Sequence, residues 1–223
     1  MNERLVERKF YHDLINLASS ARGISEVIKD VDENVRTEML ALLGSLSETM
    51  IETINLRRLY CGMIADDLKQ NPCEVDCVKL IKRLAEIYTR HPLAENKKIV
   101  HTLITTAAPA QKILLKTDKD MLQGALGYGI RTALEAAPAG ATITLTLATG
   151  TCDGKGPISF TLTFPAALRE EEKTLVFKRP EGVKQGLTSH NAYVFHALIT
   201  QILQGSVNWT IQDGTVTLEA RFE

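Results

Sequence analysis

No apolar run in this 223-residue sequence approaches the roughly 20 residues that a helix needs to span a bilayer, and the first ten residues, MNERLVERKF, are too charged for a signal-peptide core. An excess of one charge sign is also missing, since 26 Lys and Arg face 27 Asp and Glu for a net charge of −1. Without a long basic run, bulk electrostatics would hold neither a nucleic acid nor an anionic membrane. We therefore expect a cytoplasmic protein with no nucleic-acid or membrane partner.

The sequence has too few cysteines for a disulfide framework. The four cysteines, Cys61, Cys73, Cys77 and Cys152, are scattered without a paired framework, so we expect free thiols in a reducing compartment. Cys73 and Cys77 are four residues apart, as half of a metal site would be, but no second Cys or His pair stands nearby at ligand spacing. The sequence therefore predicts no metal site.

A long helical pattern occupies the first third of the chain. Apolar residues recur in steps of three and four from about residue 3 to 30 and again from about residue 35 to 70. The polar stretch DVDEN, residues 30–34, separates the two stripes. Two helices joined by so short a turn form an αα-hairpin.

An isolated hairpin of this kind exposes a stripe of apolar side chains, which must be buried against another surface. The stripe consists of Leu14, Leu17, Leu43, Leu46 and Met50. Two copies of the hairpin would close a four-helix bundle, so a homodimer is the simplest expectation. Docking of the hairpin on the second half of the chain would cover the same stripe.

Asn71 and Pro72 end the helical pattern, because a proline steers the residue before it out of helix, and they divide the chain into expected domains 1–71 and 72–223. The second domain mixes helical and strand periodicities. Helices are expected over about 74–90, 119–137 and 188–203, strands over 97–105, 112–116, 141–149 and 158–164, and a hairpin over 206–222 that turns at Asp213-Gly214. This pattern predicts an α+β sandwich with helices on one face of a mixed sheet.

One short motif in the first helix, His12-Asp13-Leu14-Ile15-Asn16, matches the phosphoacceptor box of bacterial sensor histidine kinases: a histidine, an acid, two variable residues, then Asn or Thr. Residues 76–99 resemble that family's passage into its ATPase-like domain, and residues 118–145 resemble the central helix and following strand of that domain. Over nearly its whole length the chain thus resembles a histidine kinase core. The resemblance implies a dimeric phosphotransfer hairpin followed by an ATPase-like α/β sandwich.

The position of the motif on its helix also suits this chemistry. Counted along the apolar seam, His12 falls at the heptad position farthest from the seam, and Asn16 lies one turn above it. An exposed imidazole is largely neutral at cellular pH, so one ring nitrogen has a lone pair free to attack a phosphoryl group. Asp13 could accept the proton of the other nitrogen, and Asn16 could hold a water or a phosphoryl oxygen.

Three small residues continue along the same helix. Ser19, Ser20 and Gly23 would let a helix of a partner lie close, so we expect them to form the docking surface for a receiver domain.

The nucleotide motifs of the resembled family are missing. Where the family reads Asn-Leu-Leu-x-Asn-Ala, residues 128–133 read Tyr-Gly-Ile-Arg-Thr-Ala, so both amide ligands for magnesium are replaced. Residues 165–191, which should hold the adenine-recognising aspartate, contain no Asp, although Gly182 and Gly186 remain. We therefore expect a degenerate domain without a nucleotide or metal cofactor. Glu135 and the run 170–172 are expected to be ordinary solvated acids.

An intact phosphoacceptor motif beside a degenerate nucleotide domain indicates a histidine phosphotransferase. We expect His12 to carry a phosphoryl group between the aspartates of two response-regulator receiver domains, with magnesium supplied by the receiver. The alternatives are a divergent active kinase, a scaffold that binds a response regulator without transfer, and a phosphatase that depends on Asn16. Transfer within or between the chains of a dimer is left open.

Overall fold

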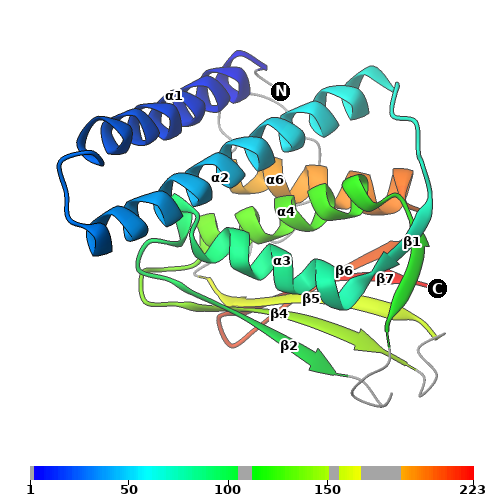
Figure 1. Cartoon of the computed structure of the whole chain (residues 1–223). Helices are drawn as coiled ribbons and strands as arrows, with labels where there is room; N and C mark the ends of the chain where they lie inside the picture. The colour runs from blue at the N-terminus through cyan, green and yellow to red at the C-terminus, as the bar shows by residue number, and fades with distance from the viewer. Residues whose placement is uncertain (1–2, 105–111, 151–155, 167–186) are drawn as a thin grey trace.

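The computed structural model describes residues 3–104, 112–150, 156–166 and 187–223, and it begins with the predicted helical hairpin (Figure 1). Helix α1 spans Glu3–Val27 and helix α2 spans Glu33–Ala65. The side chain of Asp32 caps α2 by accepting a hydrogen bond of 3.0 Å from the backbone N–H of Val35. This cap satisfies an otherwise unpaired donor, so the second helix begins directly after the turn.

The remaining elements form an α/β lobe below the hairpin (Figure 1). Its helices are α3 (Cys77–Thr89), α4 (Lys119–Ala136) and α6 (Leu187–Ala197), with short turns η1 (Pro92–Ala94) and η2 (Leu198–Ile202). Its strands are β1 (Cys73–Asp76), β2 (Lys98–Ile104), β3 (Leu114–Thr117), β4 (Thr142–Thr149), β5 (Ile158–Pro165), β6 (Ser206–Gln212) and β7 (Thr215–Phe222).

Five of these strands make one mixed sheet in the order β2-β4-β5-β7-β6, in which only β2 and β4 run parallel. Alternate residues face the helices, so that Leu145, Leu162 and Leu218 lie side by side in the core while threonines face the other way. Helices α3, α4 and α6 cover the apolar face (Figure 1). The predicted sandwich with helices on one face of a mixed sheet is confirmed.

Two details of the prediction were wrong. Residues 73–76 form strand β1 instead of the first turn of a helix, because Asp76 caps α3 by accepting from the backbone N–H of Lys79 and so ends the extended segment there. Strand β3 does not join the large sheet. It pairs antiparallel with β1 in a separate two-stranded sheet.

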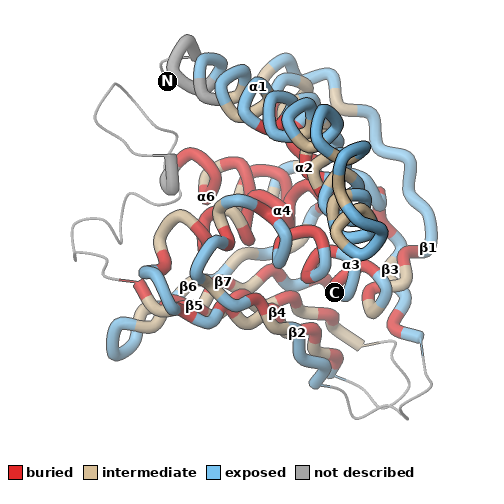
Figure 2. The backbone as a smooth tube through the Cα atoms, turned by 60° about the vertical axis from the view of Figure 1, so that its left-hand side comes forward, coloured by how far each residue is buried: buried red, intermediate tan, exposed pale blue. Residues whose placement is uncertain are grey.

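The hairpin packs on the helical layer through the second half of α2. Leu56, Leu59 and Tyr60 of α2 belong to the same hydrophobic core as the lobe. Figure 2 shows α4 and α6 mostly buried between hairpin and sheet, whereas α1 is mostly exposed. Because the two predicted domains share one core, the boundary at 71/72 stays a prediction.

The expected apolar stripe is only partly covered in a single chain. Leu17 is buried, while Leu14, Leu43, Leu46 and Met50 are half-buried. A further set of large apolar side chains on the hairpin is exposed: Tyr11, Ile15, Leu40, Leu42, Ile51 and Ile54. Docking on the lobe therefore covers one side of the second half of α2 and leaves apolar surface elsewhere on the hairpin, including Ile51 and Ile54.

Cys61, Cys73 and Cys77 are free thiols, and Cys152 lies outside the described residues. Among the described helices, none is both long and apolar enough to cross a membrane.

Candidate functional site

In the predicted phosphoacceptor motif, His12 and Asn16 lie on the exposed side of α1, while Asp13 and Leu14 are half-buried. The side chain of His12 is 69% exposed, and its Nδ1 atom lies 3.2 Å from the side-chain nitrogen of Asn16 and 3.5 Å from Oδ1 of Asp13. These two neighbours favour opposite ring tautomers. The Asn16 amide donates to an unprotonated Nδ1, whereas Asp13 accepts from a protonated Nδ1 and so leaves the lone pair on Nε2.

A strip of small and polar residues continues from His12 along α1. At 100° per residue, Asn16, Ser19 and Gly23 all fall within about 40° of His12 around the helix. All of them are exposed, and a Cβ atom at Gly23 would meet nothing within 4 Å. Ser20 is exposed as well, and both it and Asn16 line a cavity of about 300 Å³ between α1, α2 and the turn after α3.

Behind this strip, α2 meets the lobe through a buried polar cluster centred on Glu52. The hydroxyl of Tyr88 donates to Oε1 of Glu52 and the amide of Gln123 donates to Oε2, each at 3.2 Å. Burial raises the pKa of Glu52, because a desolvated carboxylate loses its hydration while these hydrogen bonds restore only part of it. A Cβ atom at Gly127 would lie 2.8 Å from Oε1 of Glu52, so glycine permits this close approach of α4 to α2.

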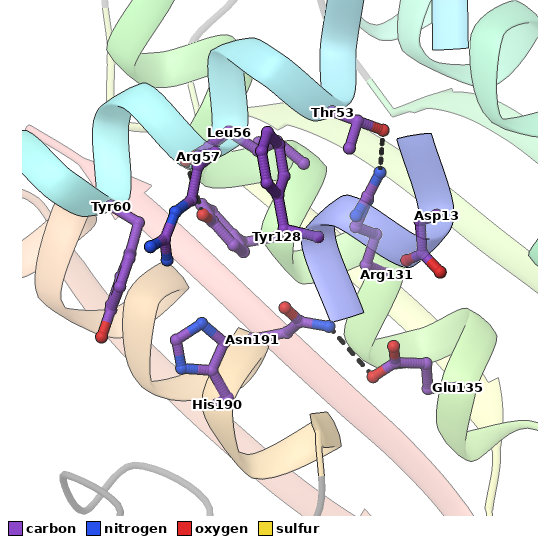
Figure 3. A pocket seen from close by; sticks show the side chains of 11 residues that line it. Asp13, Thr53, Leu56, Arg57, Tyr60, Tyr128, Arg131, Glu135, His190 and Asn191 are labelled. Atoms are coloured by element: carbon purple, nitrogen blue, oxygen red, sulfur yellow. Dashed lines mark hydrogen bonds between the residues drawn. The ribbon is translucent and has the colours of Figure 1, made fainter. Parts of the chain in front are cut away.

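Two further residues of α4 reach the hairpin (Figure 3). Arg131 donates through Nη2 to Oγ1 of Thr53 at 2.8 Å, and the same nitrogen lies 3.3 Å from Nε2 of His91. The hydroxyl of Tyr128 donates to the main-chain carbonyl of Leu56 at 2.6 Å. These contacts join the lobe directly to α2 of the helical hairpin.

The positions that would ligate magnesium in a kinase have structural partners here. The Tyr128 hydroxyl is bound to α2, and the Thr132 hydroxyl donates to the carbonyl of Tyr128 at 2.9 Å. Neither side chain carries the amide oxygen that magnesium would take, and no group of three or more metal-ligating side chains occurs among the described residues. At these two positions, the hydroxyl side chains therefore do not supply the amide ligands that magnesium would take.

No protein-family model matches the chain, and no curated protein matches it. Solved structures do. In a crystal structure with the response regulator protein TrrA, the histidine kinase ThkA matches with a TM-score of 0.57 and 14% identity over 99% of this chain and 63% of that chain. The histidine kinase AdeS of Acinetobacter baumannii matches with a TM-score of 0.54 and 15% identity over 95% of this chain and 97% of its own.

This chain has the fold of a histidine kinase core.

The structure of a bacterial phosphotransferase is also similar, with a TM-score of 0.52 and 15% identity over 98% of this chain and 94% of that chain. The TM-scores of 0.52–0.57 show a shared fold, and at 14–15% identity they show nothing about the activity of this chain.

Near the start of α6, His190 packs against aromatic side chains of α2 and α4. The ring of His190 lies edge-on to Tyr60, with ring centroids 4.8 Å apart, and it also contacts Tyr128. Burial and the neighbouring charge of Arg57 lower the pKa of His190 to about 4, so this imidazole is neutral at pH 7.

The expectation that Glu135 is an ordinary surface acid was wrong. Glu135 is half-buried and accepts a hydrogen bond of 3.0 Å from the side chain of Asn191. The run 170–172, Gly182 and Gly186 lie outside the described residues.

The sequence did not reveal the contacts that join the lobe to the hairpin. Glu52, Arg57 and Arg131 sit in helical segments where a charged residue normally faces water. Their partners lie far away in sequence; Arg131 and Thr53, for example, are 78 positions apart. The one available signal was the run of polar residues Thr49, Glu52 and Thr53 at positions that continue the buried side of α2.

Proposed function

We propose that this chain is a histidine phosphotransferase of a two-component phosphorelay. Nε2 of His12 attacks the phosphorus of an aspartyl phosphate on one receiver domain, and the bond from phosphorus to the aspartate oxygen breaks as the carboxylate leaves. Asp13 accepts a hydrogen bond from Nδ1–H and so stabilises the cationic ring that forms during transfer. An aspartate of a second receiver then attacks the phosphohistidine and regenerates His12.

One observation carries this proposal: the phosphoacceptor is exposed, while the former magnesium positions bind protein main chain. His12 is open to a visiting domain, and the hydroxyls of Tyr128 and Thr132 are bound to carbonyls of α2 and α4. Transfer between aspartate and histidine needs positioning and charge neutralisation, and it needs no nucleotide. This arrangement supports a phosphotransferase over a kinase.

The partner in this proposal is a receiver domain that docks on α1. The kinase ThkA, which shares the fold, has been crystallised with a response regulator. In this chain the docking surface would be the exposed strip formed by Asn16, Ser19 and Gly23, with Ser20 at its edge. Small side chains on this strip allow a receiver helix to approach closely enough to bring its aspartate to His12.

The active form in this proposal is a cytoplasmic homodimer. Leu40, Ile51 and Ile54 fall on one side of α2, and each is at least half exposed in the single chain. Tyr11 and Ile15 present a similar apolar face on α1, with exposed fractions of 54% and 62%. A second hairpin would cover these faces and complete a four-helix bundle.

A phosphotransfer assay tests the function. The chain is incubated with a purified receiver that carries labelled aspartyl phosphate, and the acid-labile, base-stable phosphate on the chain is counted. We expect label on the wild type and on His101→Gln, an exposed histidine of β2, and none on His12→Gln. Label on His12→Gln, or self-phosphorylation of the wild type with millimolar ATP, would contradict the proposal.

A further inference from the structure

We infer that the outer edge of strand β2 is a docking surface for an extended acidic segment of another protein. The segment adds a strand to the large sheet beside β2, and its acidic side chains face the exposed side of α3. This surface shares no residue with the phosphoacceptor motif, and it does not depend on the proposed transfer reaction.

Strand β2 has an open edge. It is the first strand in the order β2-β4-β5-β7-β6 and pairs with β4, and no other strand in the described part of the chain pairs with its outer side. In Figure 1, β2 lies at the border of the sheet with α3 above it. A strand in this position presents a row of backbone N–H and C=O groups to which a further strand can bond.

The register of β2 against β4 identifies the backbone groups on this edge. The N–H group of Lys98 donates to the carbonyl of Ala141, so the backbone groups of Lys98 face β4. In a parallel pair of strands this direction alternates from one residue to the next. The N–H and C=O groups of Ile99, His101 and Leu103 therefore point away from β4, where an added strand would bond to them.

Apolar side chains at the end of β2 are exposed. Leu103 is 39% and Ile104 is 60% exposed, and as consecutive residues of a strand they lie on opposite faces of the sheet. The strand contains no proline, and its only lysine, Lys98, is its first residue. Proline and lysine are the residues that usually keep a second strand away from an edge. An added strand would cover an apolar side chain on each face.

The exposed side of α3 and its C-cap favour an acidic partner. This side carries four cations and one acid: Lys79, Lys82, Arg83, Arg90 and Glu86. At 100° per residue, all five fall within about 60° of Lys79 around the helix, so they form one basic stripe. Lys79 lies 3.9 Å from Asp76, whereas no carboxylate of the described residues forms an ion pair with Lys82. Carboxylates of a partner would therefore complement this stripe.

The basic stripe lies on the same side of the lobe as the open edge. Helix α3 contacts the sheet through β2 and β4, and it also contacts α2 and α4. Its exposed side is the remaining one, which borders the outer strand β2 (Figure 1). A second copy of this chain fits the edge less well, because antiparallel pairing of two β2 strands would bring two basic stripes together.

A synthetic peptide tests the charge preference. A capped peptide of alternating Glu and Val, matched to β2 in length, is titrated into the full chain, and a Lys and Val peptide of the same length is the control. We expect saturable binding of the acidic peptide alone. Lys82→Glu should weaken it by about fivefold, since it reverses an exposed charge contact. Lys29→Glu makes the same change in the hairpin turn and should leave the affinity within about twofold.

A proline variant tests the backbone pairing. His101→Pro removes an outward N–H group and places a ring on the edge, while the N–H groups that bond to β4 remain. We expect it to weaken binding of the acidic peptide by about tenfold or more. His101→Gln keeps the N–H group and should bind the peptide like the wild type.

Hydrogen exchange on the wild type needs no variant, so it remains decisive even where the proline variant fails to fold. In the free chain, the amides of Ile99, His101 and Leu103 should exchange faster than those of Val100 and Thr102. Saturating acidic peptide should protect the first three amides.

Several outcomes would overturn the inference. These are no saturable binding of the acidic peptide, equal binding of the lysine peptide, equal weakening by Lys82→Glu and Lys29→Glu, and undiminished binding to a folded His101→Pro protein. Bound peptide without protection of the three outward amides would overturn it as well. Protection of these amides in the free chain that grows with its concentration would assign the edge to a second copy instead.

Discussion

In the proposed reaction, Asp13 competes with Asn16 for Nδ1 of His12 and favours the ring tautomer that attacks phosphorus. Its Oδ1 lies 3.5 Å from Nδ1, where it favours the tautomer that leaves Nε2 free to attack. We expect Asp13→Asn to slow phosphoryl transfer by about 100-fold, in the range of a lost general acid–base partner. Transfer rates from a phosphorylated receiver measure the effect, and receiver binding by calorimetry should be unchanged. Transfer at the wild-type rate would show that Asp13 has no part in the chemistry.

His190 gives the stability of the protein a pH dependence. Burial and Arg57 lower its pKa from 6.5 to about 4, so the unfolded chain binds the proton more tightly. The stabilising contribution is fully present above pH 6.5 and is lost as the pH falls toward 4, by up to about 3 kcal/mol. Urea unfolding at pH 7 and pH 4.5 measures this loss. We expect a smaller loss for His190→Gln; an equal loss would mean that other groups cause it.

At the residue scale, the sequence located His12 but not the residues behind it. The motif is local, with Asp13 and Asn16 within one helical turn, so its spacing alone places the side chains together. Glu52 and Arg57 were not identified, because their burial depends on α4 and α6 packing over α2. The spacing of apolar residues in the sequence indicates which side of a helix is buried. It does not show which polar residues pack against another helix.

Among the elements, the long and strongly periodic ones were predictable. The alternation in β4 and β5 and the Asp213-Gly214 turn, whose residues both have positive φ, gave the antiparallel part of the sheet. Strand β1 was missed because it has only four residues and runs directly into the capped start of α3. So short a strand has too few residues to show a period of two.

The contact between α2 and α4 depends on a glycine. A Cβ atom at Gly127 would lie 2.7 Å from the Tyr88 hydroxyl and 2.8 Å from Oε1 of Glu52, two groups that are buried and bonded to each other. We expect Gly127→Ala to reduce the free energy of unfolding by about 1–2 kcal/mol, because overpacking outweighs the better helix propensity of alanine.

Gly44 is the matched control for this prediction. It lies in the exposed part of α2, and a Cβ atom there would meet nothing within 4 Å. Gly44→Ala should raise the free energy of unfolding by up to about 1 kcal/mol. Urea denaturation measures both variants. A stabilised Gly127→Ala protein would mean that α2 does not pack on α4 as described.

On the scale of the whole molecule, the hairpin and lobe behave as one packed body. Leu56, which is 2% exposed, lies in the shared core, and burial of a leucine side chain stabilises by about 1.5–3 kcal/mol. The hydrogen bonds to Glu52, Thr53 and the Leu56 carbonyl add directional contacts around it. A lobe held in this way would present one fixed surface beside His12 to a docking receiver.

A dimer is expected because the packed chain still exposes apolar side chains on its hairpin. We expect light scattering at micromolar concentration to give twice the monomer mass. Ile51→Glu combined with Ile54→Glu should give a monomer, since charges replace half-exposed apolar contacts on the α2 face. Leu42→Glu, at an exposed position on another side of α2, is the control and should remain dimeric. A monomeric wild type would contradict the four-helix bundle.

In the proposed relay, residue 12 carries phosphate from one receiver to another without ATP. The most direct measurement is a complete relay: labelled phospho-receiver, this chain and an unphosphorylated second receiver, with mass spectrometry of the trapped intermediate. We expect phosphate on His12, followed by label on the second receiver, and no transfer with His12→Gln. Label that reaches the second receiver while residue 12 stays unmodified, or only when ATP is added, would contradict it.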